Sequence, residues 1–240
     1  MRDLPPPLPP AERTVGQFVG ETIRAYGDNF WRTLLLGLPL AASTQVSLGH
    51  SSRTQMLVLL AFSPLIAVAF VRACTIVHGA QPTLAAFACG LLVFAPVPIL
   101  LRFYVLPGIA WLALFGLAVP AAMIERLGFR GALERGRRLA LVDYPHALGS
   151  LSALVIVVGI SELTLVVVLR SQGDNGQRVA HVLADLVLSP LLYLGGALLY
   201  VDQAARVGSR RSDRRRRRDA HFHPPVDAQP AGRPDDQVEP

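Results

Sequence analysis

The chain has 240 residues, of which 52% are hydrophobic and 17% are charged, and its mean hydropathy is +0.41. Soluble domains contain roughly 45–50% apolar residues even with glycine counted, so the apolar share and the mean hydropathy are both high for a soluble domain. The net charge is +6, all 23 basic residues are arginine, and two cysteines are too few for an extracellular disulfide framework.

The N-terminal part of the chain changes character at Thr14. Residues 1–13 are rich in proline, and we expect them to be disordered. In residues 14–29, apolar side chains recur at spacings of three and four, which predicts an amphipathic helix with Thr14 as its N-cap. Such a helix either lies in the membrane interface or packs on a bundle. Its apolar face consists of Val15, Phe18, Val19, Ile23 and Tyr26.

Apolar segments fill the middle of the chain, each close to the roughly 20 residues that a helix needs to cross about 30 Å of hydrocarbon. They are residues 30–48, 56–77, 84–101, 108–124, 147–169 and 179–201. We therefore predict an all-α, polytopic transmembrane helical bundle of about six spans, occupying residues 14–208. Prolines interrupt all but one segment, and these create either tolerated kinks or a cavity or hinge. They are Pro39, Pro64, Pro96, Pro98, Pro120 and Pro190.

A basic amphipathic segment separates the fourth apolar segment from the fifth. Its apolar residues share one helical face, and its charged residues point elsewhere, which predicts a second interfacial helix. The apolar face consists of Phe129, Ala132, Leu133, Gly136 and Ala140, and the charged residues are Arg130, Glu134, Arg137 and Arg138.

The positions of the arginines indicate an orientation. With an even number of spans and the N-terminus inside, 19 of the 23 arginines lie on the inner side, and Arg53, Arg102, Arg170 and Arg178 lie on the outer side. Cytoplasmic loops carry such an excess of basic residues. Together with the arginine-, alanine-, glycine- and proline-rich composition, this predicts a multi-pass protein of the bacterial cytoplasmic (inner) membrane with both termini cytoplasmic.

The C-terminal segment, residues 209–240, is basic and proline-rich, and we expect it to be disordered. Its arginines serve either as an orientation signal or as contacts to anionic lipid, at about 1 kcal/mol of attraction each. We expect membrane lipids as partners, with other membrane proteins as a second class and no nucleic acid, because aromatic or fold context for it is missing. The lipid-contact candidates are Arg210, Arg211, Arg214, Arg215, Arg216, Arg217 and Arg218.

Two groups of polar residues are candidate sites. Glu162 and Asp185 lie within the last two apolar segments, at nearly equal depth in an antiparallel hairpin, and ionisable groups there are costly and often functional. They form a proton or cation site, or they are protonated or paired with Arg102, Arg170 or Arg178. The second group would clamp the basic helix to the inner rim of the bundle. It comprises Glu125, Arg135, Arg137, Arg138, Asp202 and Arg206.

The sequence has no Gly-rich phosphate loop, HExxH or GxSxG motif, so we expect no enzyme, and we expect neither a cofactor nor a metal site. Three stretches resemble a bacterial family labelled as the membrane domain of glycerophosphoryl diester phosphodiesterases, whose stand-alone relatives have no known function. They are GETIRAYGDNFWRTLLL, VLPGIAWLALFGLAVPAAMIE with ALERGRRLAL, and PLLYLGGALLYVDQAAR.

The resemblance covers about residues 14–208. The matching positions are Pro107, Gly108, Pro120, Glu125, Ala132, Leu133, Arg135, Leu139, Tyr200, Asp202 and Arg206. Relatives often carry glycine in place of Arg126 and serine in place of Gly136. In the fusions, phosphodiesterase chemistry belongs to a separate barrel domain, so the resemblance implies a membrane module and no catalytic activity. The leading hypothesis is a non-enzymatic accessory or scaffold module that contacts anionic lipid. The alternative is a small transporter or flippase-like protein that uses Glu162 and Asp185.

Overall fold

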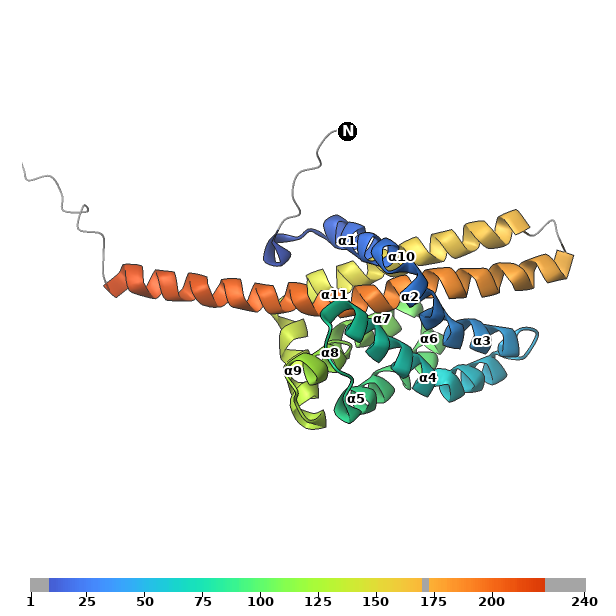
Figure 1. Ribbon diagram of the computed structural model, residues 1–240, viewed down its shortest axis with the longest axis horizontal. Helices are drawn as coiled ribbons and strands as arrows, with labels where there is room; N and C mark the ends of the chain where they lie inside the picture. Colours follow the sequence, from blue (N-terminus) through green and yellow to red (C-terminus); the bar gives the residue numbers. More distant parts are fainter. Residues whose placement is uncertain (1–8, 170–172, 223–240) are drawn as a thin grey trace, which may run out of the picture.

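The computed structural model describes residues 9–169 and 173–222, and within these ranges the regular structure is entirely helical. The helices pack side by side in a bundle along which α11 runs (Figure 1). They are η1 (Pro10–Glu12), α1 (Val15–Asp28), α2 (Phe30–Leu34), η2 (Leu35–Gly37), α3 (Leu38–Ser47), α4 (Ser52–His78), α5 (Leu84–Phe94), α6 (Val97–Phe103), α7 (Val105–Phe115), α8 (Ala118–Ile124), α9 (Phe129–Val142), α10 (Tyr144–Leu169) and α11 (Gly173–Phe222). The all-α fold is therefore confirmed.

Five helical stretches among the described residues are long and apolar enough to cross a membrane. They agree with the second to sixth predicted segments and are Ser52–His78, Leu84–Phe103, Val105–Ile124, Tyr144–Leu169 and Arg178–Arg210. On α10, large apolar side chains such as Ile160 and Leu163 are more than half exposed. Exposed apolar surface of this kind marks contact with a partner or with hydrocarbon.

The first predicted segment, residues 30–48, differs from the prediction because it is broken into α2, η2 and α3. Pro39 has no N–H to donate to the carbonyl of Leu35, where the irregular turn begins. At the same point the chain presses against α11, since a methyl group added at Gly37 would lie 2.7 Å from the carbonyl oxygen of Asp185.

The broken N-terminal segment nevertheless runs along α11 from Asp202 to Arg178. At one end Arg13 contacts Asp202, and at the other the amide nitrogen of Gln45 donates to the carbonyl of Arg178 over 3.2 Å. The end that holds Asp202 and α9 is called the arginine-rich end below, and the end that holds Arg178 is called the far end. Residues 13–45 thus connect the two ends, in short helices.

Prolines also break the hairpin formed by α5 to α8. Pro96 and Pro98 cannot donate to the carbonyls one turn earlier, and the helix is interrupted between α5 and α6. The indole nitrogen of Trp111 donates to the carbonyl of Val93 at this break, over 2.9 Å. Pro120 likewise frees the carbonyl of Gly116, where α7 and α8 separate. In contrast, Pro64 and Pro190 lie inside the continuous helices α4 and α11.

Both predicted amphipathic helices form and pack on the bundle. Thr14 caps α1 through a capping box with Gln17, as its position predicted. Helix α1 buries Phe18 against α10 and α11, whereas Ile23, assigned to the same apolar face, is 48% exposed. Helix α9 packs on α8, and a methyl group added at Gly136 would lie 2.5 Å from the backbone nitrogen of Ala118, so glycine is required there.

The structure describes helices in parts of the two segments that were expected to be disordered. Residues 9–13 belong to the segment expected to be disordered, but Pro10–Glu12 forms η1 and Arg13 is docked against α11. Residues 209–222 continue α11, which at 50 residues is about 75 Å long and projects beyond the bundle (Figure 1). The rest of the predicted disordered ends, residues 1–8 and 223–240, lies outside the described residues.

Candidate functional site

A buried ion pair joins the N-terminal segment to α11 at the arginine-rich end. Asp202 is fully buried, and its Oδ1 lies 3.1 Å from Nη1 of Arg13, whose side chain is 14% exposed. Charged groups are rarely buried without a partner, because desolvation is costly. Asp202 was expected to contact the arginines of α9. Its observed partner, Arg13, comes from the segment expected to be disordered.

Arg206 connects three parts of the chain one turn further along α11. Its Nη1 lies 2.9 Å from Oδ2 of Asp143, between α9 and α10. Its Nη2 donates to the carbonyl of Arg13 over 2.7 Å and lies 3.1 Å from Nε2 of His146. A guanidinium offers five donors in a fixed fork, so one side chain can hold several segments. The predicted cluster member Arg206 is thus central, whereas Asp143 and His146 were not anticipated.

A third ion pair holds α9 against the end of α8. Nε of Arg135 lies 2.7 Å and 3.0 Å from the two carboxylate oxygens of Glu125, and the hydroxyl of Tyr200 donates to Oε1 over 2.7 Å. Partial burial raises the pKa of Glu125, but the hydrogen bonds from Arg135 and Tyr200 and the charge of Arg135 outweigh this and hold it below its usual value. Glu125 therefore bridges α9 and α11.

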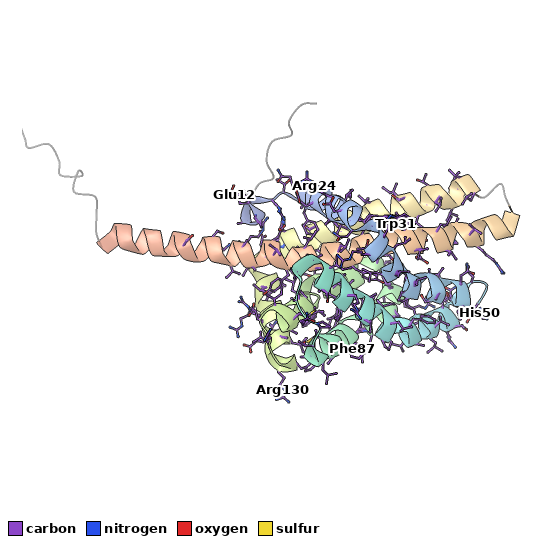
Figure 2. All side chains as sticks on the ribbon, in the orientation of Figure 1. Glu12, Arg24, Trp31, His50, Phe87 and Arg130 are labelled. Carbon is purple, nitrogen blue, oxygen red and sulfur yellow. The ribbon has the colours of Figure 1, made fainter. Side chains whose placement is uncertain are left out.

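The remaining predicted members of the rim cluster point away from the clamp. Arg138 pairs with Glu134 one turn earlier, both 68% exposed, and Arg137 is exposed. Figure 2 shows Arg130, at the start of α9, extending outward from the bundle. Helix α9 therefore presents a basic outer surface while its inner face is packed. Arg210, the predicted lipid contact whose side chain is described, donates to the carbonyl of Val142 and so caps the end of α9.

An open groove also lies at the arginine-rich end, with a volume of about 1040 Å³. It is lined by the end of α4, the connection to α5, the start of the α8–α9 connection and α11. Its polar lining residues include His78, Gln81 and Arg126. Arg126 has φ = +51°, in the left-handed region that favours glycine.

Glu162 and Asp185 lie near one another at the far end, as their equal depth predicted. Nδ1 of His181 is 3.2 Å from Oε1 of Glu162, and His181 is one turn before Asp185 on α11. Thr44 of α3 also faces Asp185. One carboxylate oxygen of Asp185 is buried without a hydrogen-bond partner among the described residues. Neither acid forms an ion pair with Arg102 or Arg178 in the described chain, and Arg170 lies outside it.

A polar stripe leads from this acidic pair into the bundle. His181, Asp185, Ser189 and Tyr193 follow one another at intervals of four residues, so they share one face of α11. Ser189 and Tyr193 are 2% and 6% exposed. The four-residue spacing of these polar residues identifies the stripe from the sequence alone, because residues 179–201 are predicted to be helical.

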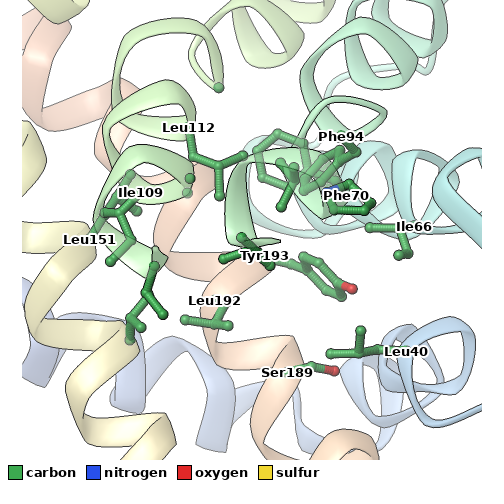
Figure 3. A pocket seen from close by; sticks show the side chains of 18 of the residues that line it. Leu40, Ile66, Phe70, Phe94, Ile109, Leu112, Leu151, Ser189, Leu192 and Tyr193 are labelled. Atoms are coloured by element: carbon green, nitrogen blue, oxygen red, sulfur yellow. The ribbon is translucent and has the colours of Figure 1, made fainter. Parts of the chain in front are cut away.

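The stripe ends at an apolar cavity of about 270 Å³ between α3, α4, α5, α6, α7, α10 and α11. Figure 3 shows Ser189 and Tyr193 beside it, among aliphatic and aromatic side chains. Both helix breaks contribute to the lining, through Phe94, Val97 and Pro98 at one and Gly116 and Leu117 at the other. The proline breaks thus coincide with a cavity, one of the two outcomes that the prolines left open.

The helices and their exposed apolar surface define a multi-pass helical membrane protein. Comparison of the chain with protein-family models, with curated proteins and with solved structures gave no match.

Proposed function

We propose that the chain is a non-enzymatic module of a bacterial inner membrane that contacts anionic lipid with its arginine-rich end. One observation carries the proposal: the Glu125–Arg135 pair and the close packing at Gly136 hold α9 flat against the bundle, while its other arginines stay exposed. An amphipathic helix in this arrangement places guanidinium groups beside lipid phosphates. The basic continuation of α11 adds residues 214–218 on the same side.

The positive-inside distribution of arginine supports cytoplasmic termini and places this surface at the cytoplasmic leaflet, which carries anionic lipid. Reporter fusions at each terminus test the orientation, and a periplasmic signal from either end would contradict it. The resemblance to the phosphodiesterase membrane domain is compatible with an accessory role, because that domain is joined to a separate catalytic barrel.

Lipid analysis tests the function directly. The protein is extracted with its surrounding lipid in polymer discs, and anionic phospholipid per protein is quantified by mass spectrometry. Changing Arg130, Arg137 and Arg138 together with arginines 214–218 to glutamine should lower the retained anionic lipid at least about tenfold, since each arginine contributes about 1 kcal/mol. Arg135 and Arg210 are left intact because they hold α9.

The matched control changes Arg53, Arg102 and Arg178, which the sequence predicts on the outer side, to glutamine. This control should retain as much anionic lipid as the wild type. Equal retention by both variants would refute the lipid-contact proposal and leave the arginines as an orientation signal only.

A second candidate function rests on the far end. The contact between Glu162 and His181, next to Asp185, is an arrangement suited to proton movement, so a small proton-coupled transporter is the alternative. Proteoliposomes with an internal pH dye test it. Wild-type protein should dissipate a pH gradient faster than the E162Q/D185N variant at equal incorporation. Equal rates would remove this alternative.

A further inference from the structure

We propose that the apolar cavity binds one hydrocarbon chain of a bilayer lipid, with the lipid's polar end toward Thr44, Glu162, His181 and Asp185. The proposal does not depend on the arginine-rich end, because it concerns a different surface and a different part of the lipid.

The lining of the cavity excludes water as its natural occupant. Among the described lining residues, Ser189 and Tyr193 carry the hydroxyl groups, and the others are almost entirely aliphatic or aromatic. Ser189 already donates its hydroxyl to the carbonyl of Asp185. A water molecule needs two to four polar partners, whereas an apolar cavity of roughly 150 Å³ stays dry and takes up benzene. This cavity, at about 270 Å³, is larger and suits a longer hydrocarbon.

The cavity is open to the surface that faces hydrocarbon. Leu101 and Val105, which line it, are 41% and 53% exposed, while Ile66 and Leu117 at its inner wall are 7% and 1% exposed. The exposed pair lies where α6 meets α7. In Figure 1 the labelled helices α6 and α7 lie nearer the middle of the bundle than the ends of α3 and α10, which extend further along the long axis. A lipid chain therefore reaches the cavity sideways, over the short α6–α7 connection.

The polar groups next to the cavity all lie on its side toward the far end. Thr44 is one turn beyond the lining residue Leu40 on α3, and Asp185 is one turn beyond Ser189 on α11, so both lie about 6 Å toward the far end. Glu162 and His181 lie on the same side. An amphiphile with its chain in the cavity thus has its polar end near hydrogen-bonding groups.

Photocrosslinking tests the proposal in the full-length protein. The protein is placed in nanodiscs of phosphatidylcholine that contain a trace of phosphatidylcholine with a diazirine at the end of one acyl chain. After illumination, adducts are mapped by mass spectrometry. We expect adducts in the buried stretch 189–196 of α11 and at Ile66 or Phe70 of α4, which lipid reaches through the cavity. Adducts confined to exposed residues such as Ile160 would overturn the proposal.

Filling the cavity provides the matched comparison. Val155→Trp on α10 places an indole in the cavity, and Leu112→Trp on α7 does so from another helix. Both should lose the adducts in residues 189–196 and keep those on exposed residues. Ile160→Trp, on α10 but outside the lining and 61% exposed, should leave all adducts unchanged. Adducts in residues 189–196 that persist in a folded filled variant would also overturn the proposal.

The wild-type adduct map needs no variant, so the test holds even if a filled variant fails to fold. It also uses zwitterionic lipid only. Failure of the lipid-chain proposal is therefore distinguishable from failure of the anionic-lipid proposal, which is measured on different variants and by retained anionic lipid.

Discussion

Replacing Gly136 by alanine should separate α9 from the bundle. The added methyl group would lie 2.5 Å from the nitrogen and 2.7 Å from the Cα of Ala118, and both atoms belong to the backbone of α8. Backbone atoms cannot move aside by rotating about a side-chain bond, so one of the two helices has to shift. The shift would strain the Glu125–Arg135 pair, which joins the same two helices.

The expected magnitude follows from two opposing effects. Overpacking costs about 1–3 kcal/mol, and contact with backbone places this case near the upper value. Alanine in a helix is about 1 kcal/mol more favourable than glycine. The net destabilisation is therefore about 2 kcal/mol. Gly131→Ala on the same helix meets Leu127 only at 3.8 Å, an ordinary contact, so it should stabilise the protein by up to about 1 kcal/mol.

Reversible unfolding in mixed micelles, with increasing sodium dodecyl sulfate and helicity as the signal, measures the difference between the two variants. We expect Gly136→Ala to be less stable than Gly131→Ala by about 3 kcal/mol. Equal stability of the two variants would show that α8 and α9 do not approach each other at Gly136, and the reasoning about the clamp would then be wrong.

Three further predictions concern the arginine-rich end. Asp202→Ala should destabilise the fold by about 3–5 kcal/mol because it leaves Arg13 buried without its partner, and D202A/R13A should cost less than the sum of the single changes in a double-mutant cycle. Glu125 has a lowered folded pKa, so its carboxylate contributes stability above its usual value of 4.5 and loses it as the pH falls through the folded pKa; the stability difference between wild type and Glu125→Gln should shrink over that range. Arg126→Gly should keep or raise the unfolding temperature, because the left-handed conformation costs a side chain about 1–2 kcal/mol, whereas Arg130→Gly inside α9 should lower it.

The polar contacts were predictable only where a local rule applied. Glu125 ends α8 and Arg135 lies on the next helix, α9, and charge complementarity next to an amphipathic helix was enough to expect a clamp. Glu162 and Asp185 were expected at one depth because residue counting in a hairpin gives depth directly. Arg13 and Asp143 could not be found in this way. Their contacts with α11 join residues 189 and 63 positions apart, so they depend on how the helices are arranged.

The apolar cavity was likewise predictable only in part from the sequence. Pro39, Pro96, Pro98 and Pro120 predicted weak points in the helices, since a missing N–H is a property of the residue itself, whereas Pro64 and Pro190 lie inside continuous helices. Whether a break leaves a void depends on what packs against it. At residues 35–37 the chain closes tightly on α11 through Gly37, whereas the breaks beside Phe94 and Gly116 border open space.

The sequence by itself determined that the chain is helical and crosses a membrane. In hydrocarbon, only long apolar helices satisfy all backbone hydrogen bonds internally, and the length and hydropathy of each segment can be read directly from its residues. It also determined the two amphipathic helices and the N-cap of the first one, Thr14. Only the tertiary structure decided that α1 and α9 pack on the bundle, that Arg13 and not an arginine of α9 neutralises Asp202, and that a cavity remains between the hairpins. These outcomes depend on close packing and on buried ion pairs between segments that are far apart in the sequence. Such interactions form only when the helices pack together in the folded protein.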